Sequence, residues 1–322
     1  MKKSLAALAA LVATGAFAQS SVNIYGVLDI GYADTNVAGV KFNQAAPVHT
    51  PSRIGFRGTE DLGGGLSANF NLETGGLNLE TGASTGINFT RESWVGLAGR
   101  FGSTRVGLTS SIASKSQSQF DLNGTSSTTS ALSLTGVGPV AWYGSSRRAS
   151  QFQYQTNKLG GLTAGLGLTL KADNGDVKNR TSVSVNYANG PIAAGFVAES
   201  RATAADRTAY ALAGSYDLGV AKVAAGYSRS RAAAVTGNNG GATTGFQGGK
   251  GVHVGVIAPI GAFKVGAQYA RNTTSKDAAL ELFANYALSK RTSVYTDIAR
   301  VNYKAAATQD VNKFGVGILH TF

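Results

Sequence analysis

Short segments in which apolar and polar residues alternate recur along this chain, and they constrain its fold more than any other feature. In the range 66–73, leucine, alanine, phenylalanine and leucine alternate with serine, two asparagines and glutamate. The ranges 181–187, 192–199 and 263–269 repeat the pattern. Successive side chains of a β-strand point to opposite faces, so each segment is predicted to be a strand with one apolar and one polar face. These ranges are the most regular parts of segments of about ten residues, which match the roughly 9–11 residues that a tilted strand needs to cross a bilayer.

The connections between these segments alternate in length. Short ones rich in Asn, Asp and Gly lie at 61–65, 99–102, 157–161, 189–191, 217–219, 259–261 and 288–291. Longer ones lie near 34–51, 79–88, 110–138, 172–180, 202–207, 232–248, 272–277 and 305–312. Seven short turns and eight long loops require sixteen strands. Because an unpaired strand edge is costly in hydrocarbon, the expected fold is all-β, a closed transmembrane antiparallel 16-stranded β-barrel.

The N-terminus has the features of a secretory signal. Lys2 and Lys3 precede an apolar run over 5–13, and Ala16-Phe17-Ala18 has the small-residue spacing of a cleavage site. We therefore expect a signal peptide at 1–18 and a single barrel domain at 19–322. The chain has no Cys, which suits an exported protein, and the mature part has no run of 18 apolar residues.

The charge balance is basic, with 29 Lys and Arg against 17 Asp and Glu, a formal net charge of +12. The basic residues are scattered along an exported chain, so nucleic acid is not an expected partner. Strand alternation places many of them on the polar, lumen-facing side, where a charge costs less than on the lipid face. Lumen-facing positions inferred in this way include Arg53, Arg57, Arg105, Arg147 and Lys264. The alternation is ambiguous for Arg91, because the same parity would also turn Val95 and Leu97 inward.

No motif for catalysis, a cofactor or a metal stands out. His49, His253 and His320 are too far apart for a metal site, and no His lies in a hydrolase motif with Ser and a carboxylate. His253 is the one candidate for an outer-membrane barrel enzyme, and a lone polar lumen residue explains it better. The stretch 248–251 lacks the spacing of a phosphate-binding loop. The expectation is no enzyme activity, no cofactor and no metal.

Several stretches resemble the Gram-negative general porins, in particular the betaproteobacterial branch. They are Val22–Asp29, Ser52–Leu66, Arg91–Gly102, Leu288–Tyr295 and the terminal Phe322. The resemblance implies a sixteen-stranded barrel, a homotrimer in the outer membrane among lipid and lipopolysaccharide, and a third loop folded into the pore. It also implies an arginine cluster on the wall facing that loop, which maps to Arg53, Arg57 and Arg91 together with Arg147 or Arg148.

The third loop corresponds to 110–138, where Lys115 and Asp121 are the few charges. The family usually carries more acidic residues here, and only Gln119-Phe120-Asp121 matches its common motif. An exposed outer loop is the alternative to an inward one.

The resulting hypothesis is a general diffusion porin, a water-filled channel for small hydrophilic solutes and ions that prefers anions. Its pore-lining residues are expected to include Arg53, Arg57, Arg91, Arg105, Arg147, Lys115, Asp121 and Lys264. A substrate-specific channel, a barrel enzyme and an adhesive barrel remain as alternatives. Aromatic residues in the lumen would favour a specific channel, and most aromatics are expected on the lipid face.

Overall fold

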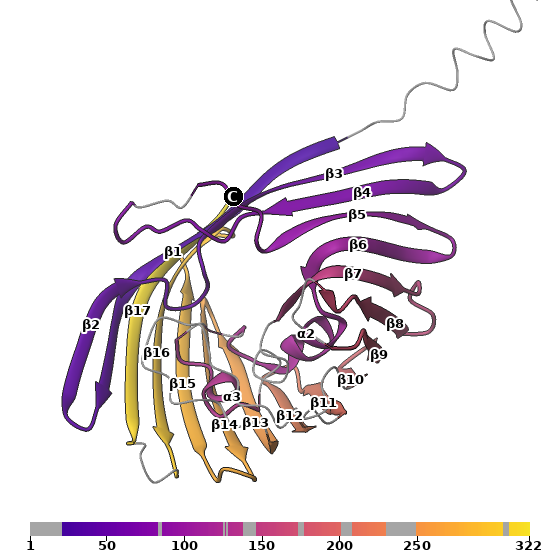
Figure 1. Ribbon diagram of the computed structural model, residues 1–322. Helices are drawn as coiled ribbons and strands as arrows, with labels where there is room; N and C mark the ends of the chain where they lie inside the picture. The colour runs from indigo at the N-terminus through magenta and orange to yellow at the C-terminus, as the bar shows by residue number, and fades with distance from the viewer. Residues whose placement is uncertain are drawn as a thin grey trace, which may run out of the picture.

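The computed structural model describes residues 21–82, 86–124, 126, 128–137, 146–172, 177–200, 208–229, 249–304 and 309–322. The predicted signal peptide at 1–18 lies outside these residues. Antiparallel strands dominate the fold (Figure 1). They are β1 (Ser21–Val37), β2 (Val40–Ala46), β3 (Arg53–Gly63), β4 (Leu66–Glu73), β5 (Glu92–Gly99), β6 (Gly102–Ser110), β7 (Arg147–Gln155), β8 (Leu162–Thr169), β9 (Arg180–Asn189), β10 (Ile192–Glu199), β11 (Ala209–Asp217), β12 (Lys222–Arg229), β13 (Lys250–Ile260), β14 (Phe263–Asn272), β15 (Ala278–Ala287), β16 (Thr292–Asn302) and β17 (Val311–Thr321).

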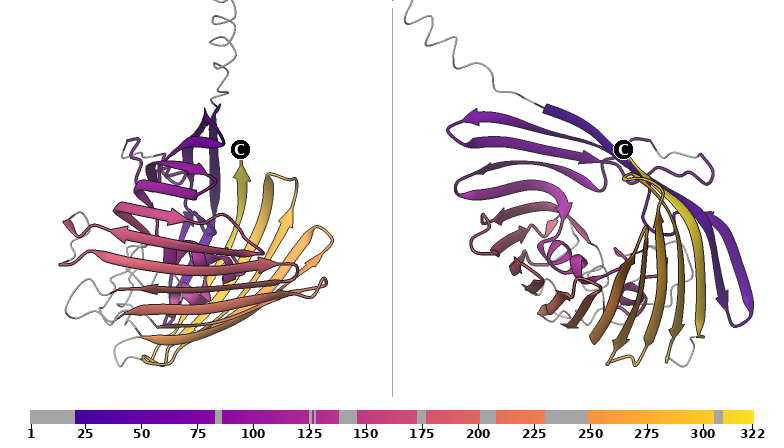
Figure 2. Two further views of the ribbon diagram at one scale, coloured as in Figure 1. Left: turned by 90° about the vertical axis from the view of Figure 1, so that its right-hand side faces the viewer. Right: turned by 180° about the vertical axis from the view of Figure 1, so that it is seen from behind.

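The sheet closes on itself where β1 pairs with β17. From β3 onward each strand pairs with the next along the chain, and β17 returns to β1, so no strand of the ring lacks a partner. The closure extends to Phe322, whose amide and carbonyl each form a 3.1 Å hydrogen bond with the backbone of Gly26. Figure 2 shows the tilted strands from two further sides.

β2 and β3 act as one strand of the barrel, which brings the count to the predicted sixteen. β2 pairs with residues 31–37 of β1, and β3 pairs with residues 21–27 of the same edge. The expected long loop at 34–51 is therefore wrong over most of its length. A tight turn at Ala38 and Gly39, with φ of 51° and 91°, joins β1 to β2. Positive φ at both central residues is the hairpin geometry that matches strand twist. Only 47–52, between β2 and β3, leaves the wall.

The two faces of the wall differ as the alternation predicts. On β9, Val183 and Val185 are 40% and 50% exposed, whereas Ser182 and Ser184 are 4% and 5% exposed. The exposed apolar side chains form the outer surface, and the polar side chains line the interior. The seven predicted short connections all coincide with hairpin turns between paired strands.

The described residues of the segment 111–137 lie against the inner face of the wall. The segment contains α2 (Ile112–Gln117), η1 (Ser118–Phe120) and α3 (Ala131–Leu134). α2 packs against β9 and β10, and α3 packs against β14 and β15. Figure 1 shows both helices inside the curve of the strands. Within this segment, the side chains of Phe120 and Leu132 are buried. No helix in the described part of the chain is long and apolar enough to span a membrane.

Candidate functional site: an arginine pocket on the lumen wall

A cavity of about 530 Å³ lies on the inner wall formed by β3 to β7, and five predicted arginines meet there. We refer to it as the arginine pocket. Its lining residues are Asn23, Arg53, Arg57, Gly58, Thr59, Asn69, Phe70, Asn71, Glu73, Arg91, Glu92, Trp94, Arg105 and Arg147. Five arginines against two glutamates leave a formal charge of +3. The pocket is therefore suited to attract small anions rather than cations.

Strand alternation explains how β3 and β6 supply their arginines. Arg53 and Arg57 are four residues apart on β3, so they project from the same face. Val106 on β6 is 40% exposed on the outside, and its neighbour Arg105 lines the pocket. All three side chains line the same cavity.

Arg91 reaches the pocket by a different route, which removes the ambiguity in its strand parity. β5 begins at Glu92, so Arg91 precedes the strand and does not follow its alternation. Within β5, Val95 and Leu97 are exposed, and Glu92 and Trp94 line the pocket. Arg91 can thus point inward without turning the apolar residues of β5 inward.

Two glutamates hold three of the arginines. The Nε of Arg91 lies 2.6 Å from Oε1 of Glu73, and the Nε of Arg53 lies 3.6 Å from Oε2 of the same carboxylate. Glu92 lies 4.0 Å from Nε of Arg147. Glu92 also accepts hydrogen bonds from the hydroxyls of Thr109, at 2.6 Å, and Ser110, at 2.8 Å. These contacts fix Glu73 and Glu92 on the wall and offset part of the arginine charge.

The other two arginines are stacked on aromatic rings. The guanidinium of Arg57 lies 4.9 Å from the ring centre of Tyr25, and that of Arg105 lies 4.5 Å from the ring centre of Trp94. Within the described residues, neither guanidinium has a carboxylate oxygen within 4.0 Å. Their positive charge is therefore not offset by an ion pair.

A local distortion of β7 places two consecutive arginines on the inside. Ser150 has a φ of 48°, and the pairing of β6 with β7 shifts between Gly107 and Thr109. Arg147 thereby lines the pocket, whereas Arg148 lies 3.6 Å from Glu199. Of the two arginines between which the sequence leaves the choice open, Arg147 lies in the pocket and Arg148 lies beside Glu199.

Lys115 on α2 extends the basic surface from the wall to the inserted segment. Its Nζ donates to Oε1 of Gln153 at 2.9 Å and to the hydroxyl of Thr109 at 3.3 Å. Burial lowers the pKa of Lys115 to about 7, and the positive charge of Arg105 acts in the same direction. Its charge therefore changes near neutral pH.

The remaining two predicted residues lie elsewhere. Asp121 belongs to the inserted segment and is buried. Its carboxylate accepts hydrogen bonds from Ser130 at 2.6 Å and Gln268 at 2.9 Å. Lys264 is exposed, one residue after the start of β14 and next to a short turn. Neither lines the arginine pocket.

Acidic side chains on the opposite wall anchor the inserted segment instead. Glu281 accepts hydrogen bonds from the side chain of Asn123 at 2.7 Å and from the backbone of Ala131 at 3.0 Å. Asp297 accepts from Asn123 at 3.2 Å. These carboxylates are at most 1% exposed, so they contribute to the fixed path of the segment 111–137 and not to an open acidic surface.

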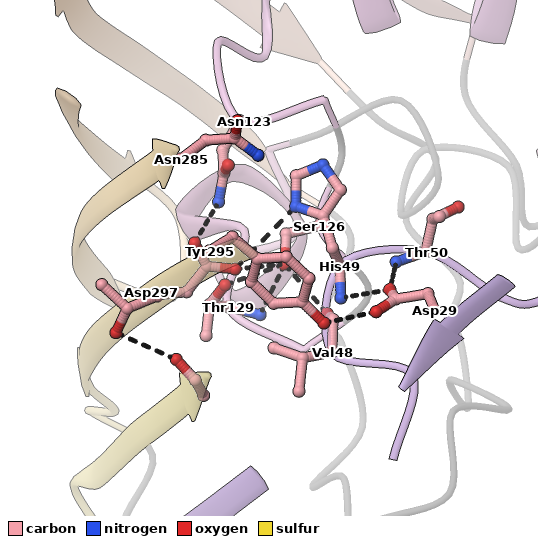
Figure 3. A network of polar contacts seen from close by, with 12 residues as sticks. Asp29, Val48, His49, Thr50, Asn123, Ser126, Thr129, Asn285, Tyr295 and Asp297 are labelled. Atoms are coloured by element: carbon pink, nitrogen blue, oxygen red, sulfur yellow. Dashed lines mark hydrogen bonds and ion pairs between the residues drawn. The ribbon is translucent and has the colours of Figure 1, made fainter. Parts of the chain in front are cut away.

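A second inserted stretch, 47–52, meets the same region (Figure 3). Asp29 accepts backbone hydrogen bonds from His49 at 2.8 Å and Thr50 at 2.5 Å, and it also accepts one from the Tyr295 hydroxyl. The carbonyl of Val48 accepts from Ser126 at 3.2 Å. The stretch 47–52 between β2 and β3 thus contacts the inserted segment 111–137 and helps to hold it in place.

Sequence reasoning missed Glu92, Trp94 and Tyr25 as parts of the site. The signal was present for Glu92 and Trp94, since exposed Val95 and Leu97 put both on the opposite face of β5. In the described ranges, no group of three or more His, Cys, Asp or Glu residues is placed to hold a metal ion.

Comparison with known proteins agrees with this geometry. The family described as Gram-negative porin matches residues 4–306. Outer membrane porin protein 32 of Delftia acidovorans is 33% identical over 347 residues, covering 98% of this chain and 94% of the relative.

Solved structures show the same architecture. The anion-selective porin from Comamonas acidovorans superposes with a TM-score of 0.78 at 25% identity, covering 94% of this chain and all of that chain. A trimer form of OmpT from Vibrio cholerae has a TM-score of 0.64 at 14% identity, covering 94% of this chain and 99% of the other. The second likeness concerns the fold alone.

Proposed function

Because this chain belongs to the Gram-negative porin family and is an outer-membrane general diffusion porin, we propose that its arginine pocket makes the pore prefer anions. The observation that carries the proposal is the formal charge of +3 among the charged residues lining one cavity of the lumen wall. A permeating anion meets this charge in a narrow, partly desolvated space, where electrostatic interactions are stronger than in bulk water. The similar Comamonas structure is described as anion-selective, which supports the same conclusion.

The inserted segment and the pocket together form the selective part of this proposed pore. α2 carries Lys115 to within 3.3 Å of Thr109 on β6, so the segment lies next to the arginine wall. Solutes that pass between them are small and hydrophilic, and the surrounding apolar outer face contacts membrane lipid and lipopolysaccharide. The working unit is a homotrimer, and residues 1–18 are a signal peptide that is removed on export.

The direct test is the reversal potential of single channels in a planar bilayer under a KCl gradient. The wild-type protein should reverse toward the chloride potential. The double variant Arg57→Ala/Arg105→Ala removes the two pocket arginines that have no carboxylate partner among the described residues, and its reversal potential should move toward zero. The control Lys290→Ala removes a positive charge from a short turn remote from the pocket and should keep the wild-type value. A wild-type reversal toward the potassium potential would overturn the proposal.

A further inference from the structure

The rings of Trp94 and Tyr25 lie on the lumen side of the wall beside the arginines that have no ion pair within the described residues, and Phe70 also lines the pocket. Trp94 lines the arginine pocket, and Tyr25 lies next to it under Arg57. The Tyr25 hydroxyl donates to Asn71 at 2.8 Å and to Glu73 at 2.9 Å, which holds the ring in place. The wall therefore presents aromatic rings as well as positive charge at this place.

Trp94 contributes its ring and not its N–H group. Buried tryptophans usually place the indole N–H on an acceptor. The Nε1 atom of Trp94 is buried and has no acceptor within the described residues, whereas its ring lies 4.5 Å from the Arg105 guanidinium. Within the described residues, the polar contact of this indole is therefore made by its ring face with Arg105.

Each stack leaves a planar guanidinium with one face on a protein ring. A guanidinium can stack on aromatic faces and bind a carboxylate through its edge at the same time. Arg57 and Arg105 have no carboxylate partner in the described structure, so their edges can serve an incoming anion. A ligand that carries both a carboxylate and an aromatic ring would use both properties, and an aliphatic carboxylate would use only one.

We propose that the arginine pocket binds aromatic carboxylates in preference to aliphatic carboxylates of the same size and charge. The inference rests on the proposed anion-preferring pore and names the solute class for which the pore has the highest affinity. The cavity of about 530 Å³ has the volume of a site for a small organic ligand, for which about 300–1,000 Å³ is usual. A benzoate-sized anion therefore fits without displacement of the wall.

The test compares benzoate with cyclohexanecarboxylate as blockers of the chloride current through single channels at neutral pH. Both anions have six-membered rings and one negative charge, and they differ in aromaticity. Benzoate should halve the chloride current at a concentration roughly fivefold lower, which is the ratio that one cation–π contact at a partly exposed site supplies. Arg57→Lys/Arg105→Lys keeps both positive charges without the planar guanidinium faces and should bring the two half-blocking concentrations together, whereas Trp94→Phe, which keeps a ring under Arg105, should retain most of the difference.

Phe152→Leu is the matched control, because Phe152 is 47% exposed on the outer face of β7 and should leave the benzoate preference intact. Equal block by the two anions in the wild-type protein would overturn the inference and leave the chloride preference standing. A wild-type channel without chloride preference would instead overturn the proposed function. A benzoate preference that persists in full in Arg57→Lys/Arg105→Lys would also overturn the inference, because the stacked guanidinium groups would then not be its cause.

Discussion

The side chains of Arg91 and Glu73 form an ion pair in which Nε and Oε1 are 2.6 Å apart, although Arg91 belongs to no strand. Glu73 is the last residue of β4, and Arg91 directly precedes β5. The ion pair therefore joins the two ends of the long connection between these strands. The same carboxylate reaches Arg53 at 3.6 Å. Glu73 therefore holds two arginines in place and lowers the positive charge that a solute meets.

Replacement of Glu73 by Gln is expected to strengthen the anion preference. The amide oxygen can still accept a hydrogen bond from Arg91, and the formal charge of the pocket rises from +3 to +4. One charge at about 4 Å is worth ~1 kcal/mol in bulk water, so the chloride-to-potassium permeability ratio should rise by up to roughly fivefold.

The measurement is the reversal potential at two salt concentrations. Ionic screening should reduce the difference from wild type as the KCl concentration increases. Glu60→Gln, at an exposed position on β3 outside the pocket lining, is the control for the loss of one carboxylate. A lower chloride preference in Glu73→Gln would contradict this account of the ion pairs.

The anion preference should fall as pH rises through neutrality. Lys115 has a pKa lowered to about 7, chiefly by burial. It is charged at pH well below that value and neutral well above it, so the pore loses one positive charge on going from about pH 6 to about pH 8. Glu92 opposes the shift and Arg147 adds to it, but neither changes its direction.

The reversal potential measured across this pH range should follow a single titration. Lys115→Met keeps the length of the side chain without the charge, and it should flatten the profile at the high-pH value. A Lys115→Met channel with the same pH profile as wild type would assign the titration to another group.

Loss of the Glu281 carboxylate should release the inserted segment 111–137 without opening the barrel. Glu281→Ala removes the acceptor of the Ala131 amide and one of the two carboxylates that accept from Asn123, and a buried donor left unpaired costs about 1–3 kcal/mol. Because the segment occupies the lumen, single-channel conductance should become larger or noisier. Proteolysis should cut within 111–137 more readily than in wild type.

Heat-dependent gel mobility of the folded barrel should stay near the wild-type value, since the strand pairing of β15 is unaffected. Glu60→Ala, which also removes an acidic side chain from a strand, serves as the comparison. An unchanged conductance and cleavage pattern in Glu281→Ala would mean that the anchor lies elsewhere.

Much of the wall could be predicted from the sequence, because a strand that separates lipid from water shows its two faces in the residue pattern. The alternation of Leu66–Glu73 and the Gly-rich turns were sufficient for the strand count and for the inward side of Arg53 and Arg57. β2 was missed, because its alternation of apolar and polar residues holds only over Val40–Asn43 and breaks at Gln44. It is held by its pairing with β1, which the pattern of 40–46 alone does not indicate.

The contacts within the site could be predicted less well from the sequence. Arg91 lies just before β5, where alternation no longer applies, and only the ion pair with Glu73 determines its direction. The inserted segment is anchored by contacts such as Asn123 with Glu281, residues 158 positions apart. Such long-range pairs depend on the closed barrel and have no local signal. The bulge at Ser150 likewise follows from the pairing of β6 with β7.

The position of the arginine pocket along the chain also bears on how recombination between genes would transfer the ion preference. Its arginines and glutamates, together with the inserted segment, lie in one continuous stretch of the chain, residues 53–147. The strands that follow complete the ring and supply the acceptors at Glu281 and Asp297. A recombination event that exchanges the stretch 53–147 between two such genes would therefore transfer the ion preference as a unit, provided that the recipient keeps these two carboxylates.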